Sequence, residues 1–78
     1  MNRIKFNGDV MSLVYAMTSD CLIFFEFEKG SSCLMYINGM MKEDGTGTTW
    51  IVTGYDAPRR KFVKLFVRTG ALYTAKPC

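Results

Sequence analysis

The strongest constraint on this chain is the alternation of apolar and polar residues that begins at Cys21 and recurs between short polar turns. Such runs fit β-strands, because successive side chains of a strand point to opposite faces of a sheet. We expect five short strands of β-prone composition, over residues 22–28, 33–41, 48–55, 61–69 and 71–74. With 78 residues, of which 49% are hydrophobic, the chain has room for one small domain around one core.

Turn-forming residues separate these strands. Gly30 lies in the first turn, over residues 28–32, where we expect it to take a positive φ in a tight hairpin. Asn38-Gly39 interrupts the second strand and predicts a bulge or a sharp bend. Residues 42–47 are polar and contain two glycines, and they predict a loop.

The segment before the strands has helical periodicity. Apolar residues at positions 10, 13, 14 and 17 lie on one face of a helix, and Asp9 is placed to cap its first turn. Two valines and a tyrosine in the segment also suit a strand. We expect a short N-terminal helix over about residues 9–19.

One helix followed by five short strands predicts an α+β fold that is mostly β. The expected form is a small five-stranded antiparallel barrel or a strongly curved sheet, because closure removes the strand edges that invite aggregation. The alternative is an open antiparallel sheet with the helix packed on one face.

Several classes of active site are excluded by composition. The chain has no histidine, which removes imidazole-dependent triads and the most common zinc ligand. Glu43-Asp44 precedes two glycines but lacks the regular oxygen ligands and the closing glutamate of a calcium loop. We therefore expect a protein that is not an enzyme and that holds no metal and no cofactor.

The cysteines and the hydropathy predict a cytoplasmic protein. Three cysteines, without a C-x-x-C pair, fit free thiols better than a secreted disulfide framework. The charge-free stretches are shorter than the ~20 residues of a membrane helix, and Gly8-Asp9 interrupts the apolar core that a signal peptide needs. Because so short a chain gains stability from shared burial, we also expect a homodimer or a larger homo-oligomer.

Charge is distributed unevenly along the chain. Residues 1–56 carry seven acidic and four basic side chains, whereas residues 57–78 carry six basic and no acidic ones. Arg59, Arg60 and Lys61 form a basic turn that is able to meet phosphate or an acidic protein surface, or that is simply solvated.

The strand over residues 61–69 separates two kinds of face. Its valines and its leucine alternate toward a core. The opposite face consists of Phe62, Lys64, Phe66 and Arg68. Rings interleaved with cations form a platform on which single-stranded nucleic acids stack their bases. The competing interpretation packs both rings beneath the helix or a neighbouring subunit, and pairs the cations with Glu26 and Glu28.

Aromatic residues make up 14% of the chain, more than so small a core hides comfortably. Aromatic side chains and arginine dominate the energetic centres of protein interfaces. The side chains that we expect to contact a partner are Trp50, Tyr55, Arg59, Arg60, Lys61, Phe62, Lys64, Phe66 and Arg68.

The layout of the chain is a short helix, an acidic strand that ends in Glu28-Lys29-Gly30, a bent strand, a hairpin, and a last strand of the type Phe62-Val63-Lys64-Leu65-Phe66-Val67. This layout resembles that of small Sm-like barrels and, most closely in its proportions, that of the bacterial Rho-inhibitor (Rof) family. The resemblance lies in the order of elements and assigns no residue a role. It implies either RNA binding in a ring or obstruction of a nucleic-acid machine by a docked barrel.

These observations predict a non-catalytic binding protein. The expected role is that of a phage or mobile-element inhibitor or adaptor, for example in anti-defence, which docks on a host nucleic-acid-processing protein or protein–nucleic-acid complex and blocks it sterically. The alternative is a small-barrel protein that binds RNA or single-stranded DNA. No membrane partner is expected.

Overall fold

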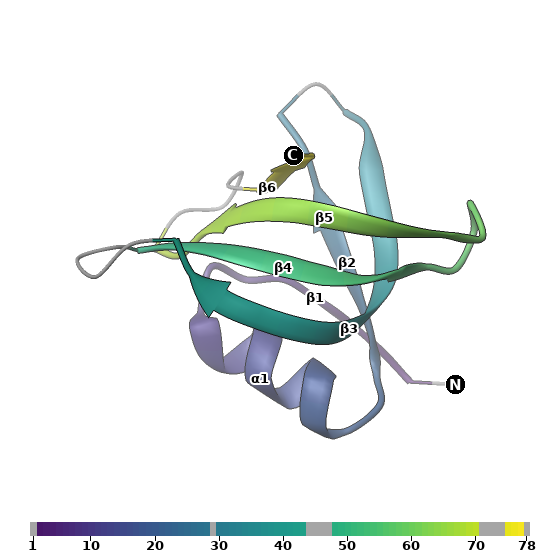
Figure 1. The fold of residues 1–78 in the computed structure, drawn as a ribbon, viewed down its shortest axis with the longest axis horizontal. Helices are drawn as coiled ribbons and strands as arrows, with labels where there is room; N and C mark the ends of the chain where they lie inside the picture. The colour runs from purple at the N-terminus through teal and green to yellow at the C-terminus, as the bar shows by residue number, and fades with distance from the viewer. Residues whose placement is uncertain (1, 29, 44–47, 71–74, 78) are drawn as a thin grey trace.

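A computed structural model describes residues 2–28, 30–43, 48–70 and, as backbone, 75–77. In chain order the elements are β1 (Arg3–Lys5), α1 (Val10–Thr18), β2 (Leu22–Glu26), β3 (Ser32–Lys42), β4 (Thr49–Asp56), β5 (Lys61–Arg68) and β6 (Ala75–Pro77) (Figure 1). The expected α+β, mostly β class is confirmed. The strand predicted over residues 71–74 lies outside the described residues.

The described strands form one mixed sheet in the order β1-β2-β3-β4-β5-β6. β1 and β6 stand at opposite ends of this order, so the sheet is not closed and the predicted barrel is wrong (Figure 1). The alternative, an open sheet with the helix packed on one face, is confirmed except that the sheet is mixed and not antiparallel, because β1 pairs with β2 in parallel. Parallel neighbours need a crossover connection, and α1 supplies it between these two strands.

β3 is the strand that bends the sheet. Its first half pairs with β2 and its second half pairs with β4. A register shift between Ile37 and Gly39 leaves Asn38 in the predicted bulge. Figure 1 shows the result, with β2 and the start of β3 crossing the direction of β4 and β5.

The core lies between α1 and the inner face of the sheet. α1 packs against β2 and β3, and Leu13 and Ala16 are its buried residues. The buried hydrophobic cluster comprises Phe6, Leu13, Ala16, Ile23, Phe25, Cys33, Met35, Ile37, Val52, Leu65 and Val67. Residues from the N-terminal segment to β5 thus contribute to one core, as expected for a chain of this length.

Local signals in the sequence account for the boundaries of α1 and for the first hairpin. The Asp9 side chain accepts a hydrogen bond from the backbone N–H of Met11 at 3.0 Å, and it caps the helix as predicted. At the other end, the backbone N–H of Ser19 donates to the carbonyl of Tyr15. Gly30 has a φ of 82° in the β2–β3 turn, which confirms its expected positive φ.

Candidate binding surface

The surface of β3, β4 and β5 that points away from the core collects aromatic and basic side chains. Pairing between neighbouring strands aligns Tyr36, Tyr55 and Phe62 in one row. A second row aligns Met41, Ile51 and Phe66, and Thr53 pairs with Lys64 between the rows. We call this surface the outer face and define it by Tyr36, Met41, Ile51, Thr53, Tyr55, Phe62, Lys64, Phe66 and Arg68.

Phe62 is the most exposed large apolar side chain of the outer face. It is 73% exposed, and its ring meets that of Tyr55 edge to face, with centroids 5.2 Å apart. It therefore does not pack beneath α1, which contacts β2 and β3 on the other side of the sheet. Met41, at 62%, is also exposed. Each row of the outer face thus exposes one large apolar side chain, and exposed apolar area of this kind can mark an interaction surface.

The cations of the outer face are not neutralised by the acidic residues that the sequence suggested. Glu26 instead forms an ion pair with Lys5 of β1, with Nζ 3.1 Å from Oε1. β3 and β4 separate β2 from β5, so Glu26 cannot reach across to β5. Lys64 and Arg68 are exposed, and within the described part of the chain neither forms an ion pair.

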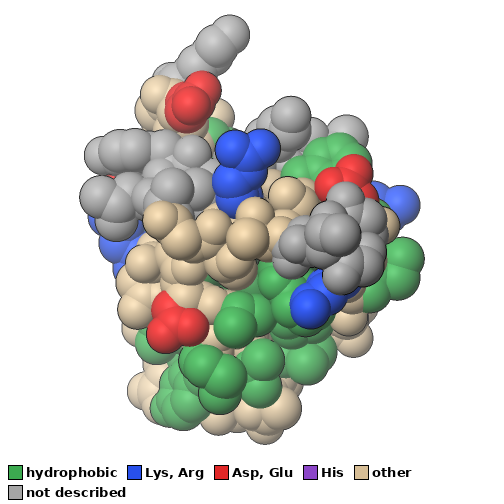
Figure 2. Space-filling model, turned by 90° about the vertical axis from the view of Figure 1, so that its left-hand side faces the viewer, with side chains coloured by type: hydrophobic (Ala, Val, Ile, Leu, Met, Phe, Trp, Pro, Cys, Tyr) green, Lys and Arg blue, Asp and Glu red, His purple; other side chains and the backbone are tan. Residues whose placement is uncertain are grey.

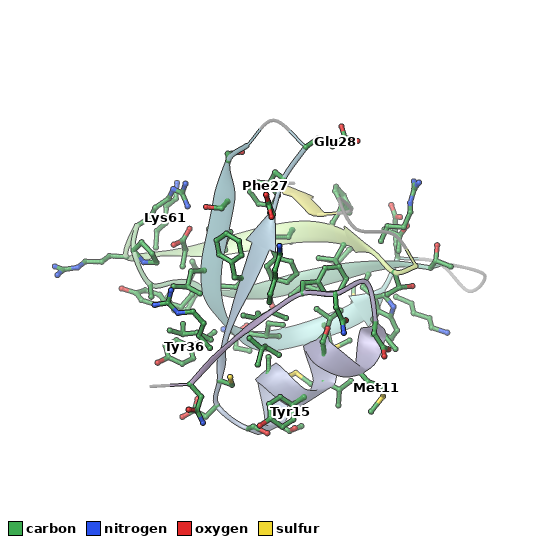
Figure 3. All side chains as sticks on the ribbon, turned by 180° about the vertical axis from the view of Figure 1, so that it is seen from behind. Met11, Tyr15, Phe27, Glu28, Tyr36 and Lys61 are labelled. Atoms are coloured by element: carbon green, nitrogen blue, oxygen red, sulfur yellow. The ribbon has the colours of Figure 1, made fainter. Side chains whose placement is uncertain are left out.

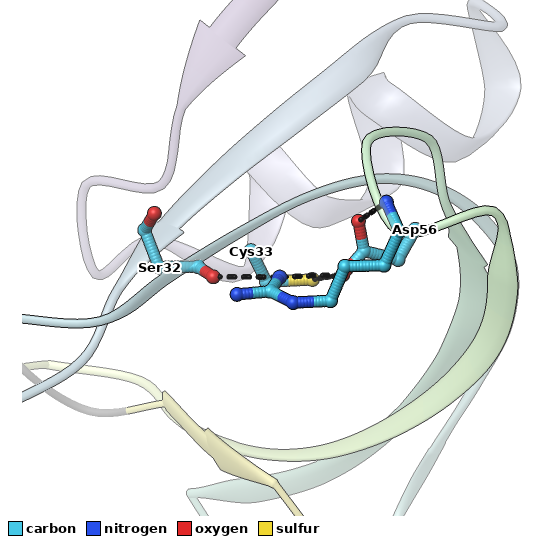
Figure 4. A network of polar contacts seen from close by, with 4 residues as sticks. Ser32, Cys33 and Asp56 are labelled. Carbon is cyan, nitrogen blue, oxygen red and sulfur yellow. Dashed lines mark hydrogen bonds and ion pairs between the residues drawn. The ribbon is translucent and has the colours of Figure 1, made fainter.

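The β4–β5 turn is held by a polar cluster around the buried Asp56 carboxylate (Figure 4). The Arg59 guanidinium donates to Oδ2 of Asp56 at 2.8 Å and to the carbonyl oxygen of Ser32 at 3.0 Å. The Cys33 thiol donates to the same carboxylate with an Sγ–Oδ2 distance of 3.6 Å. Asp56 is only 1% exposed, so these contacts replace the water that its charge has lost. Arg59 therefore fastens the turn to the beginning of β3.

This cluster shifts the pKa values of its members. Burial, followed by the charge of Asp56, raises the pKa of the Cys33 thiol to about 12. Burial also pushes the pKa of Asp56 upward, but the hydrogen bonds from Arg59 and Cys33 outweigh it and hold that pKa below its ordinary value. At neutral pH the cluster thus contains a carboxylate and a neutral thiol, which is unsuited to act as a nucleophile.

The structure brings together part of the predicted contact set. The outer face holds five of its members, namely Tyr55, Phe62, Lys64, Phe66 and Arg68. Arg60, with a φ of 55°, and Lys61 are exposed where β4 turns into β5. Trp50 lies on the inner side of β4, packed against the core, with Lys42 Nζ 5.8 Å from its ring centroid. Trp50 therefore lies outside the outer face, and Arg59 anchors the turn beside it with a side chain that is 51% exposed.

Sequence reasoning missed Tyr36 and Ile51 as members of the outer face. Both alternate with buried residues of their strands, and that pattern was the available signal. The alignment of Tyr36 with Tyr55 depends on the register of β3 against β4, and that of Ile51 with Phe66 on the register of β4 against β5, and the pattern gives neither. In Figure 3, Tyr36 and Lys61 lie toward the same end of the sheet, where β4 turns into β5.

A second apolar area lies on α1. Met11 and Tyr15, one helical turn apart, are 61% and 52% exposed, and Figure 3 shows both pointing away from the sheet. α1 itself has no charged residue. Figure 2 shows the end of the molecule at which α1 begins, where hydrophobic side chains gather below basic ones. This area is separate from the outer face.

The described ranges contain no group of three histidine, cysteine, aspartate or glutamate side chains placed to hold a metal ion. No helix among the described residues is long and apolar enough to cross a membrane. In comparisons with known proteins, no family model, no curated protein and no solved structure matches this chain. The function is therefore argued from the geometry of the outer face.

Proposed function

We propose that this chain is a non-catalytic binding protein whose outer face docks on a nucleic-acid-processing protein or protein–nucleic-acid complex. It acts as a stoichiometric inhibitor or adaptor and blocks access to that complex by occupying space. The observation that supports this proposal is the exposure of Phe62, at 73%, on a strand face that also carries Lys64 and Arg68.

Two physical effects favour docking through this surface. Covering exposed apolar area removes it from water and stabilises a complex by about 25 cal/mol per Å². The cations Lys64 and Arg68, with Arg60 at the adjoining turn, favour a partner of negative potential and accelerate its association. Because the outer face is the outside of a sheet whose inner face is the core, binding there leaves the fold intact.

The test is capture of partners from a cell lysate by the immobilised full chain, with and without nuclease treatment. We expect the wild-type chain to retain a partner in stoichiometric amount, and Phe62→Ala to lose most of it. Met11→Ala is the matched control, because Met11 is similarly exposed on α1 and should leave capture unchanged. Equal capture by the wild-type chain and Phe62→Ala would contradict the proposal.

A further inference from the structure

We infer that the outer face binds single-stranded nucleic acid, with bases stacked on Phe62 and Phe66 and phosphates held by Lys64 and Arg68. This inference rests on the proposed function and specifies it, because it names the part of the target complex that the surface contacts. Three observations support it, namely the spacing of the two rings, the exposure of Phe62 and the position of the cations between and beside the rings.

The spacing along β5 suits a short single strand. Phe62 and Phe66 are four residues apart on one face of the strand, or about 13 Å at ~3.3 Å per residue. Lys64 lies midway between them on the same face. Stacked nucleotides rise ~3.4 Å each, so about four of them cover this distance. The rings and cations therefore alternate along β5 at intervals that let one strand contact all of them.

The Phe62 ring is accessible for stacking, and the Phe66 ring is half-buried on the same face. In the edge-to-face pair of Tyr55 and Phe62, with rings inclined at 69°, the edge of one ring covers only one face of the other. Phe62 is 73% exposed, which leaves room for a planar base. Tyr36 lies next to Tyr55 in the same row and widens the platform across the sheet by one strand spacing, ~4.8 Å.

Acidic side chains that the structure describes are engaged away from the outer face, which favours binding of a polyanion there. Glu26 is paired with Lys5 on the far strands, and Asp56 is buried against Arg59. Glu43 follows the end of β3. Its backbone N–H donates to the carbonyl of Thr49, the partner of Arg68.

A second copy of the chain is a poorer occupant of this surface than a nucleic acid. Two outer faces packed together would bring Lys64 and Arg68 of one copy against the same cations of the other. Like charges at close range oppose association, whereas a phosphate backbone releases counterions when it binds them. The charge of the surface therefore selects the anionic ligand.

The test uses the purified full chain and fluorescent twelve-nucleotide probes of oligo(dT) and oligo(rU), with a duplex of equal length for comparison. Anisotropy titrations at rising salt measure Kd. We expect micromolar or tighter binding to at least one single-stranded probe, weaker binding to the duplex, and affinity that falls with salt. Phe62→Ala should weaken binding about tenfold, Phe62→Tyr should retain it, and Lys64→Ala should reduce the salt slope by about one.

Controls separate a failed inference from a damaged protein. Phe62 is exposed, so circular dichroism and the Tm of Phe62→Ala should match those of the wild-type chain, and Met11→Ala should bind the probes normally. Failure to bind either single-stranded probe at 50 mM salt overturns the inference, as does duplex binding equal to single-strand binding. If a protein partner is still captured after nuclease treatment and its capture depends on Phe62, the inference of nucleic-acid binding is overturned while the proposed function stands. If Phe62→Ala changes neither the captured partners nor the Kd for the probes, both the inference and the proposed function are overturned.

Discussion

Among the glycines of the described strands, Gly54 leaves the least space for a side chain. It pairs with Ile37, where β3 and β4 approach each other beside the bulge. A Cβ built on Gly54 would overlap the carbonyl oxygen of Tyr36 and the Met35 side chain, and would lie 2.9 Å from the Tyr36 carbonyl carbon. Backbone atoms of a paired strand cannot move aside without loosening the pairing. Gly54→Ala should therefore push β3 away from β4.

The expected cost of Gly54→Ala follows from that overlap. Overpacking in a closed core costs about 1–3 kcal/mol, and more where the backbone must shift. We expect about 3 kcal/mol for Gly54→Ala, because the obstacle is largely backbone. In a domain of this size, each kcal/mol lowers Tm by about 4–8 °C, so the predicted loss is about 12–24 °C.

Gly39→Ala is the matched control on the facing strand. A Cβ at Gly39 would meet the hydroxyl oxygen of Thr53 at 3.0 Å, and that side chain can rotate at the cost of one hydrogen bond, about 1 kcal/mol. Urea titration and thermal melts of both variants give the comparison. Free energies of unfolding for the two variants within about 0.5 kcal/mol of each other would refute the argument that the approach at Gly54 is tight.

Three further predictions concern the polar cluster around Asp56 and the oligomeric state. The pKa of Cys33 rises from 9.0 to about 12, so the unfolded chain loses its thiol proton first. The free energy of unfolding should therefore fall between these values by up to about 1.4 kcal/mol per pH unit, a component that Cys33→Ala should abolish in urea titrations. The pKa of Asp56 lies below 3.8, so its stabilising contribution is present above that pH and is lost as the pH falls further. Asp56→Asn should flatten this acid limb in thermal melts. Finally, the expected homo-oligomer should appear in light scattering as a dimer or a larger species, and a wild-type monomer at high micromolar concentration would contradict it.

Features that depend on neighbouring residues were predictable. α1 formed where the apolar period and the Asp9 cap agreed, and the bulge formed at Asn38-Gly39. The two faces of β5 separated as the alternation predicts, with Leu65 and Val67 buried and Phe62 exposed. These outcomes follow from local geometry, since side-chain direction within a strand and capping within a helix need no distant partner.

Features that depend on distant pairing were not predictable in the same way. β1 has three residues, too few for a period, and its parallel pairing with β2 made the sheet mixed and left it open. The expected neutralisation of Lys64 by Glu26 failed because strand order placed β3 and β4 between them. Asp56 gave no sign in the sequence of being buried, since its partner Cys33 lies on another strand.

Local residue patterns account for the helix, for the longer strands with the turns between them, and for the side chains that share a face of β5. Strand order and register account for the row of Tyr36, Tyr55 and Phe62, for the cations beside it that have no ion pair among the described residues, and for the anchoring of the turn by Arg59. A repeating pattern specifies the direction in which a side chain points, whereas its neighbours are set by the strands that pair with its own.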